Sequence, residues 1–374
     1  MKKEIKILLF IIITTMPLFA QQDHIAKFLK CGLPKLEDYK CFDYSTIEAT
    51  NPIEWELSDD YNKKQIPKRF LAQMAFMRTA SFMVIKDGKI LHEEYWLNYT
   101  ENSKMNSFSV AKSIVALLVG IAIKDGKIQS INQKVKDFIP YYSDGLDSNL
   151  TIIDLLSMSS GTNWTEEFAN PMSDIAIAYY GSSLDSLMIK THLEESPGNK
   201  WHYQCGNTVI LAMILEKATG QKIYEYAQEK LWTPLGTTND AYWGKDNPDG
   251  MTKAFCCFYA TPRDFAKLGL LVLNNGKFNG QQIVPAEFIE AATQPANWLT
   301  YKGKPVDFYG LHFWLVNFHK KKIPYMSGVF GQYIFIFPKQ NAVVIRFGEM
   351  LNELKIQPIH PDVPLYLKVA DKFI

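Results

Sequence analysis

Two β-prone segments, one toward each end of the chain, are the first regular feature of the hydrophobic pattern. Residues 81–96 (SFMVIKDGKILHEEYW) place two apolar runs around Asp87-Gly88, a dipeptide typical of hairpin turns. Residues 331–338 (GQYIFIFP) and 341–348 (NAVVIRFG) are almost continuously apolar, which predicts a second hairpin with strands covered on both faces. Because strands come early and late, the pattern predicts one sheet built from both ends of the chain.

Helical patterns fill the interval between these strands. The run from Ser109 to Ala122 is rich in Val, Ile, Leu and Ala and stops near Asp125-Gly126, which predicts a buried helix ended by glycine. An all-helical insertion is expected at roughly residues 125–235. Three further helices have start signals, namely Thr151 before 152–158, Asn207 or Thr208 before 209–218, and Thr261 with Pro262 before 263–273. Two stop signals are Gly220, which follows the helix at 209–218, and residues 233–236 (TPLG), which follow a helix at 224–232.

The beginning of the chain has its own pattern. Residues 1–20 combine a basic start (MKKEIK) with a short apolar run and a small residue, Ala20, before polar QQDH. This pattern predicts a signal peptide cleaved after Ala20, and therefore export to the periplasm or the exterior with no stable membrane span afterwards. An uncleaved anchor is the alternative, although the apolar run is short for a span. Residues 21–65 are expected to form an irregular arm and residues 66–374 the main domain.

Composition narrows the classes of function. Apolar residues make up 47% of the chain and charged residues 21%, which predicts a folded globular protein. A net charge of +1 without a basic stripe argues against nucleic-acid binding. The 7 histidines are scattered and no tight acidic cluster accompanies them, so we expect neither a metal centre nor a cofactor.

The 5 cysteines add one structural expectation. Cys31 and Cys41 lie ten residues apart in the N-terminal arm and could pair in an oxidising compartment. Adjacent cysteines such as Cys256 and Cys257 are more often buried thiols than a bridge. Any pairing leaves one cysteine over, and the lack of a C-x-x-C sequence excludes zinc ribbons and thioredoxin-type sites.

Candidate chemistry centres on Ser109 and Lys112, an S-x-x-K sequence at the start of the predicted buried helix. Residues i and i+3 share a helix face, and a serine nucleophile needs a base within hydrogen-bonding reach. Lys112 is the only charged residue between Lys104 and Lys124, and desolvation lets a buried lysine lose its proton. A helix start also offers the Ser109 backbone N–H to a developing oxyanion. The alternative is that Ser109 is only a helix cap.

A second polar element lies in the sequence WHYQCGN at residues 201–207. The Tyr203 hydroxyl, beside a lysine ammonium, would have its pKa lowered from about 10 and could shuttle protons. His202 is another candidate base, but adjacent residues of an extended segment point in opposite directions, so only one of the two faces a cleft. The chain has 19 tyrosines, and the alternative is that Tyr203 belongs to the core.

A third element, Ser327-Gly328, leads into the strand segment 331–338. Glycine permits close approach of a ligand to the backbone. The backbone N–H of Val329 is therefore a candidate second donor to an oxyanion. The alternative is a plain turn into a strand.

These three elements, in this order and at these separations, resemble the serine β-lactamase and penicillin-binding-protein superfamily. Within it, the chain is most similar to the β-lactamase-related hydrolases typified by 6-aminohexanoate-dimer hydrolase and the family VIII-type esterases. The resemblance implies an α+β sandwich of the β-lactamase/transpeptidase type, an antiparallel sheet flanked by helices with an inserted all-helical subdomain. It runs from about Phe70 to Phe347 and is carried by FSVAKSIVALLVGIAIKDGKI, TIIDLLSMSSGTNW, HYQCGNTVILAMILEKATG, LWTPLG, KAFCCFYATPRDFAKLG and GQYIFIFP.

The resemblance also implies roles for the site residues. Ser109 resembles the acylated nucleophile, Lys112 its general base, and Tyr203 the residue that passes a proton to the leaving group. Which of Lys112 and Tyr203 is the first base stays open, since the two would titrate together. Cys205 stands where the tyrosine motif of the family usually has Asn.

The third family motif is also altered. Met326-Ser327-Gly328 stands where penicillin-recognising members have K-T-G, and the Val329 N–H would join that of Ser109 in the oxyanion hole. In those members the polar groups of both motifs help to bind a substrate carboxylate. Their loss argues against efficient β-lactamase or peptidoglycan peptidase activity and leaves nucleophile, base and oxyanion hole in place.

The sequence therefore predicts an exported serine hydrolase that acts through an acyl-enzyme on small amide or ester substrates. The alternatives are a β-lactamase or D-alanyl-D-alanine carboxypeptidase, and a low-turnover penicillin-binding-like sensor. No G-x-S-x-G sequence occurs, which argues against an α/β-hydrolase. The expected partner is a small molecule, and the oligomeric state stays open.

Overall fold

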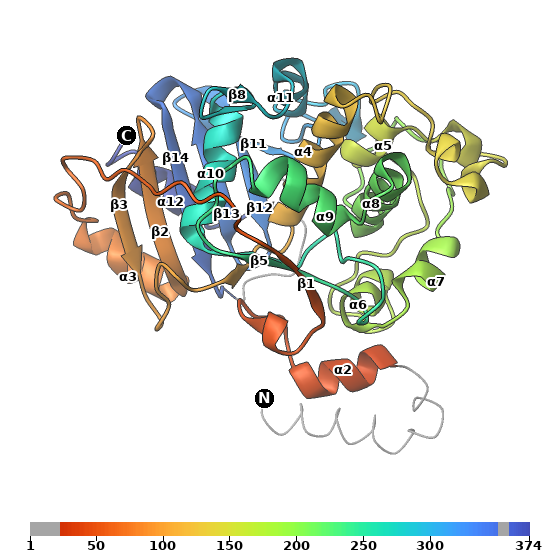
Figure 1. Ribbon diagram of the computed structural model, residues 1–374, viewed down its shortest axis with the longest axis horizontal. Coiled ribbons are helices and arrows are strands. Elements are labelled where there is room, and N and C mark those ends of the chain that lie inside the picture. Colours follow the sequence, from red (N-terminus) through yellow and green to blue (C-terminus); the bar gives the residue numbers. More distant parts are fainter. Residues whose placement is uncertain (1–22, 351–358) are drawn as a thin grey trace.

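The computed structural model describes residues 23–350 and 359–374. The predicted signal peptide, residues 1–20, lies outside the described residues. Within the described ranges, no helix is both long and apolar enough to cross a membrane. Figure 1 shows a large sheet on one side of the molecule and a helical region on the other.

An antiparallel sheet of six strands forms one half of the core. Its strands are β2 (Thr79–Lys86), β3 (Lys89–Tyr95), β11 (Trp314–Phe318), β12 (Lys321–Gly328), β13 (Gln332–Phe337) and β14 (Ala342–Gly348). The strand order is β11-β12-β13-β14-β2-β3, so two early strands complete a sheet made from late ones. Both predicted hairpins, β2–β3 and β13–β14, are confirmed, as is the sheet built from both ends of the chain.

Helices cover both faces of this sheet, which explains its continuously apolar central strands. They are α10 (Pro262–Leu273) on one face and α3 (Lys68–Phe76) with α12 (Val363–Ala370) on the other. A Cβ on Gly269 would lie 2.5 Å from Val343 Cγ1, so this glycine lets α10 approach β14 closely. On the opposite face Tyr366 of α12 contacts the Arg346 guanidinium. Val343 and Arg346 point to opposite faces because side chains alternate along a strand.

The long buried helix α4 (Val110–Lys124) precedes the helical region in the chain. It contacts both α8 and β12 and so joins the two halves of the molecule. The remaining helices outside the N-terminal segment are η2 (Val135–Asp137), η3 (Pro140–Tyr142), η4 (Asp147–Asn149), α5 (Ile152–Leu156), α6 (Asp174–Tyr180), α7 (Leu184–Ile189), α8 (Cys205–Thr219), α9 (Ile223–Ala227), the π-helix η5 (Gln228–Trp232), α11 (Ala286–Ala292) and η6 (Pro338–Gln340). Four two-residue strands form small ribbons, namely β7 (Lys277–Phe278), β8 (Gln281–Gln282), β9 (Thr300–Tyr301) and β10 (Lys304–Pro305).

Local signals placed most helix ends correctly. Thr261 caps α10 with its side chain, and Gly220 ends α8 in the left-handed conformation with φ 75°. The predicted start of α8 is wrong by three to four residues, because Gln204 is the N-cap and the helix begins at Cys205. Asn207 does not act as a cap, since its amide oxygen accepts a hydrogen bond from Ser160 Oγ at 2.6 Å.

The N-terminal segment, expected to be irregular, contains ordered elements. They are α2 (Asp23–Cys31), η1 (Asp38–Lys40) and β1 (Tyr44–Ile47). The last of these pairs with β5 (Ala241–Gly244) in a four-stranded sheet ordered β1-β5-β6-β4, together with β6 (Phe258–Ala260) and β4 (Met105–Asn106). Cys31 and Cys41 form a disulfide, and Asp38 bonds to Tyr179 and to Tyr259 Oη, the latter at 2.7 Å. Order in this segment thus comes from distant partners, which no local pattern reveals.

Candidate active site

Ser109 occupies the turn that opens α4. It is the N-cap residue, with φ −69° and ψ −3°, and its hydroxyl makes no capping hydrogen bond. The preceding residue, Phe108, has a left-handed φ of 45°, and its N–H donates to Asn106 Oδ1 at 2.8 Å. A bulky aromatic residue adopts this conformation only where the surrounding structure enforces it. The turn therefore presents the half-buried Ser109 with its hydroxyl unused by the helix.

Lys112 lies one turn along the same helix and points to the serine. Its Nζ donates to Ser109 Oγ at 3.0 Å, to Cys205 Sγ at 3.2 Å and to the Phe255 carbonyl oxygen at 2.8 Å. The side chain is buried, with only 2% of its surface exposed. Among the described residues, the side chains hydrogen-bonded to this buried lysine are thus a hydroxyl and a thiol.

Tyr203, and not His202, faces this site. Tyr203 is buried while His202 is exposed, and Lys112 Nζ lies 5.1 Å from the centre of the Tyr203 ring. Burial raises the pKa of Tyr203 well above its usual value, and a side-chain hydrogen bond with Ser109 opposes this only in part. The expected lowering of this pKa by lysine is therefore wrong, because desolvation of the phenolate outweighs it. A phenol that stays protonated cannot act as a base at neutral pH, so we expect Lys112 to be the first base.

Gly328, the last residue of β12, brings the strand end against the backbone of the serine. A Cβ on Gly328 would lie 2.3 Å from the Ser107 carbonyl oxygen and 3.1 Å from the Ser109 nitrogen. Only glycine permits this approach. Val329 follows in the chain, and Gln332 Nε2 donates to its carbonyl oxygen at 3.0 Å, which holds the peptide in place. The predicted oxyanion segment therefore ends beside Ser109.

The other residues of this motif are internal. Met326 is fully buried and pairs with Ile334 of β13, and Ser327 is 3% exposed. The Met326 side chain is thus part of the core, although its position in the motif corresponds to a substrate-binding lysine in penicillin-recognising members.

Glu166 is a candidate site residue that the sequence analysis missed. Its Oε1 accepts a hydrogen bond from Cys205 Sγ at 2.7 Å, and its Oε2 accepts from the Trp164 indole at 2.7 Å. Part of the residue reaches solvent, but burial of the carboxylate raises its pKa, and the positive charge of Lys112 offsets this in part. The sequence NWTEEF resembles an ordinary polar loop, so only the three-dimensional contact with Cys205 reveals the role.

The two remaining cysteines near the site differ from expectation. Cys256 and Cys257 form a disulfide, whereas free thiols were predicted. Cys257 has a left-handed backbone with φ 63°, and this conformation has no signature in the sequence. The same turn presents the Phe255 carbonyl to Lys112. Cys205 is a buried free thiol.

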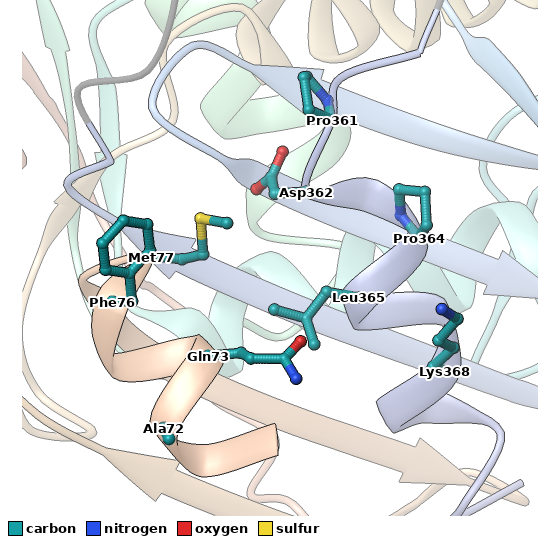
Figure 2. A pocket seen from close by; sticks show the side chains of 9 residues that line it. All are labelled: Ala72, Gln73, Phe76, Met77, Pro361, Asp362, Pro364, Leu365 and Lys368. Atoms are coloured by element: carbon teal, nitrogen blue, oxygen red, sulfur yellow. The ribbon is translucent and has the colours of Figure 1, made fainter. Parts of the chain in front are cut away.

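Elsewhere in the described structure there is a groove, but no cluster of metal ligands. Among residues 23–350 and 359–374, no group of three His, Cys, Asp or Glu side chains is placed to hold a metal ion. A groove lies between α3 and α12, as Figure 2 shows. Its lining contains none of the predicted site residues and comprises Ala72, Gln73, Phe76, Met77, Pro361, Asp362, Pro364, Leu365 and Lys368.

Known proteins are similar to this chain in fold and, at low identity, in sequence. A family model described as Beta-lactamase matches residues 68–350. The 6-aminohexanoate-dimer hydrolase of Paenarthrobacter ureafaciens is 24% identical over 286 residues, which cover 72% of each chain. A Bacillus anthracis structure, provisionally named 6-aminohexanoate-dimer hydrolase, superposes with a TM-score of 0.77 at 20% identity, covering 89% of this chain and 92% of that one. A family VIII carboxylesterase superposes with a TM-score of 0.65 at 17% identity, covering 86% and 99%. The predicted β-lactamase/transpeptidase-like fold is confirmed.

Proposed function

We propose, from the premise that this chain belongs to the Beta-lactamase family and is a serine hydrolase, that it cleaves small amides or esters through an acyl-enzyme on Ser109. The observation that carries the proposal is the 3.0 Å contact between Lys112 Nζ and Ser109 Oγ at the opening of a buried helix. A serine whose hydroxyl does not cap its own helix and has an amine beside it is arranged for nucleophilic attack.

Acylation follows from this geometry. Lys112, as the neutral amine, takes the proton of Ser109 Oγ while that oxygen attacks the substrate carbonyl carbon. The carbonyl oxygen becomes an oxyanion, and the backbone N–H groups of Ser109 and Val329 stabilise it. One such donor is worth about 3 kcal/mol of transition-state stabilisation.

The leaving group then departs with a proton. Tyr203 suits this step because its raised pKa keeps the phenol protonated, and the Lys112 ammonium, 5.1 Å from its ring, can restore the proton. Water next attacks the acyl carbonyl carbon and gives its proton to Lys112. Ser109 Oγ then leaves and takes this proton back from Lys112, which regenerates the serine hydroxyl and the neutral amine.

Two residues bear on the substrate class. Cys205 and Met326 are both buried and replace polar groups that penicillin-recognising members direct at a carboxylate. We therefore expect substrates without a carboxylate beside the scissile bond. Amides and esters both remain candidate substrates, because one relative is named 6-aminohexanoate-dimer hydrolase and one similar structure a family VIII carboxylesterase.

Export remains part of the proposal. It is supported by the basic and apolar residues 1–20 and by the disulfide between Cys31 and Cys41, since disulfides persist in oxidising compartments. N-terminal sequencing of the protein recovered outside the cytoplasm should begin at Gln21. Recovery of intact Met1 from the cytoplasm would contradict export and leave the hydrolase proposal unaffected.

Burst kinetics on a p-nitrophenyl ester test the hydrolase proposal. The protein should release about one equivalent of nitrophenol rapidly and then turn over, and Ser109→Ala should do neither. Ser113→Ala is the matched control, because Ser113 lies on the same helix and donates instead to the His312 carbonyl at 2.6 Å. A burst without turnover would favour the sensor, and rapid hydrolysis of a chromogenic cephalosporin the β-lactamase. Turnover that survives in Ser109→Ala would refute the proposal.

A further inference from the structure

The contacts of Lys112 match those of a charged side chain, which must lose a proton before it can act as a base. Its Nζ lies within hydrogen-bonding distance of three atoms, and a lysine ammonium has three N–H donors. One acceptor is the nucleophile itself, Ser109 Oγ. Another is the Phe255 carbonyl oxygen, which takes no proton at neutral pH. The third, Cys205 Sγ, also carries a proton of its own and can pass one on.

The thiol of Cys205 connects Lys112 to a carboxylate. Cys205 Sγ accepts from Lys112 at 3.2 Å and donates to Glu166 Oε1 at 2.7 Å. The other carboxylate oxygen, Oε2, is occupied by the Cys205 backbone N–H at 2.8 Å and the Trp164 indole N–H at 2.7 Å. Oε1 is therefore the oxygen left to receive a proton, and it faces the thiol.

Packing fixes the carboxylate in this position. A Cβ on Gly206 would lie 2.5 Å from Trp164 Cε3, so the glycine lets the indole lie against the first turn of α8. The indole in turn holds Glu166 Oε2. Through these contacts the carboxylate is held at the N-terminus of the 15-residue helix α8.

We propose that Glu166 is a positioning residue that takes up the surplus proton of Lys112 through the thiol of Cys205. A proton leaves Lys112 Nζ for Cys205 Sγ while the thiol proton moves to Glu166 Oε1. The products are an amine, a thiol and a carboxylic acid in place of an ammonium, a thiol and a carboxylate. No charge enters or leaves the site. The proposal rests on the acyl-enzyme function of Ser109 and explains how its base becomes neutral.

The electrostatics of the neighbouring groups agree with this transfer. Burial raises the pKa of Glu166, which favours the protonated acid. Burial also raises the pKa of Cys205 well above its usual value, so the thiol relays a proton without becoming a thiolate. The other titratable groups that face Lys112 are Tyr203, a phenol, and His312, which stays neutral because burial and Lys112 lower its pKa to about 3.

An internal transfer has a distinct pH signature. Because the pair stays neutral overall, the acylation rate of the wild type should be flat across neutral pH. In Glu166→Gln the proton of Lys112 must leave for solvent, so log kcat/KM should rise with pH at a slope near one. At pH 7 we expect a loss of about a hundredfold, the lower end of the range of general acid–base contributions. The loss should disappear at high pH, which a structural defect would not permit.

Variants of Cys205 separate the relay from packing. Cys205→Ala cuts the path and should reproduce the pH slope of Glu166→Gln, and the double variant should add nothing further. Cys205→Ser restores a hydroxyl relay and should return the flat profile. These variants keep the test valid if Glu166→Gln fails to fold.

Stopped-flow burst kinetics between about pH 5.5 and pH 10, on wild type and the four variants, decide the matter. Flat profiles in Glu166→Gln or Cys205→Ala would overturn the relay, as would a sloping profile in Cys205→Ser. Failure of the underlying function looks different, because the wild type would then show no burst at any pH.

Discussion

Gly328→Ala is expected to remove most of the acylation activity while the protein stays folded. The new Cβ would lie 2.3 Å from the Ser107 carbonyl oxygen, 0.7 Å inside the 3.0 Å limit that real Cβ contacts respect. Its second contact, at 3.1 Å, is the Ser109 nitrogen, so both neighbours are backbone atoms without alternative rotamers. The end of β12 must therefore move away from Ser109, and with it the Val329 N–H.

The expected size follows from the donor that is lost. Removing one oxyanion donor typically lowers kcat by about 10²–10³-fold. The strain of overpacking should cost about 1–3 kcal/mol of stability, which a protein of this size tolerates. The assay is the burst rate constant on a p-nitrophenyl ester, normalised to folded protein measured by thermal unfolding.

Gly269→Ala is the matched control for this prediction. Its Cβ would lie 2.5 Å from Val343 Cγ1 on the sheet, a comparable clash with no connection to Ser109. It should lower the unfolding temperature and leave the burst rate constant unchanged. A wild-type burst rate in folded Gly328→Ala would refute the assignment of the β12 end to the oxyanion hole, and equal losses in both variants would show a folding effect.

Three further outcomes are expected from the structure. The folded state should lose stability as the pH falls from about 6.5 toward 3, because burial lowers the pKa of His312 to about 3 while the unfolded chain takes up a proton near 6.5. His312→Gln should make the plot of unfolding temperature against pH less steep, and His92, whose pKa burial lowers to about 4, keeps part of the slope. An unchanged plot would contradict this. Replacing Cys31 and Cys41 by Ser should lower the free energy of unfolding by about 3 kcal/mol, given a sequence separation of 10, as denaturant titration can check; no change would mean that the arm is held without the bridge. Asp38→Ala removes the acceptor of a hydrogen bond from Asn106 Nδ2 at 3.0 Å, so it should lower the free energy of unfolding by about 1–3 kcal/mol and slow the burst. An unchanged burst rate would show that the N-terminal segment does not support the turn that holds Ser109.

The parts of the fold predicted correctly are those that local patterns specify. Continuous apolar runs identify strands such as β13 and β14, because a sheet covered on both faces needs apolar residues at every position. Thr261 and Gly220 identify helix ends because their capping chemistry acts within a few residues. The order of the N-terminal segment was missed because Asp38 depends on Tyr179 and Tyr259, which are 141 and 221 residues away.

At the site, the sequence identified the pair of Ser109 and Lys112 because helical spacing alone brings residues i and i+3 together. The predicted direction of the Tyr203 pKa was wrong. A neighbouring lysine ammonium suggested a lowered pKa, but burial of the phenol, which the sequence does not reveal, raises it instead.

Cys205 shows how a substitution that looks like a loss can conceal a new connection. Taken alone, the replacement of Asn by Cys removes an amide that could hold a substrate, and this suggests a weakened site. In the structure the thiol lies between Lys112 and Glu166, and it both accepts and donates a hydrogen bond. An amide at this position would offer separate donor and acceptor atoms, and no single atom that takes a proton from one side as it gives one to the other. A serine or a cysteine is therefore compatible with a lysine base whose proton is held on a carboxylate, and an asparagine requires a different way of neutralising that lysine.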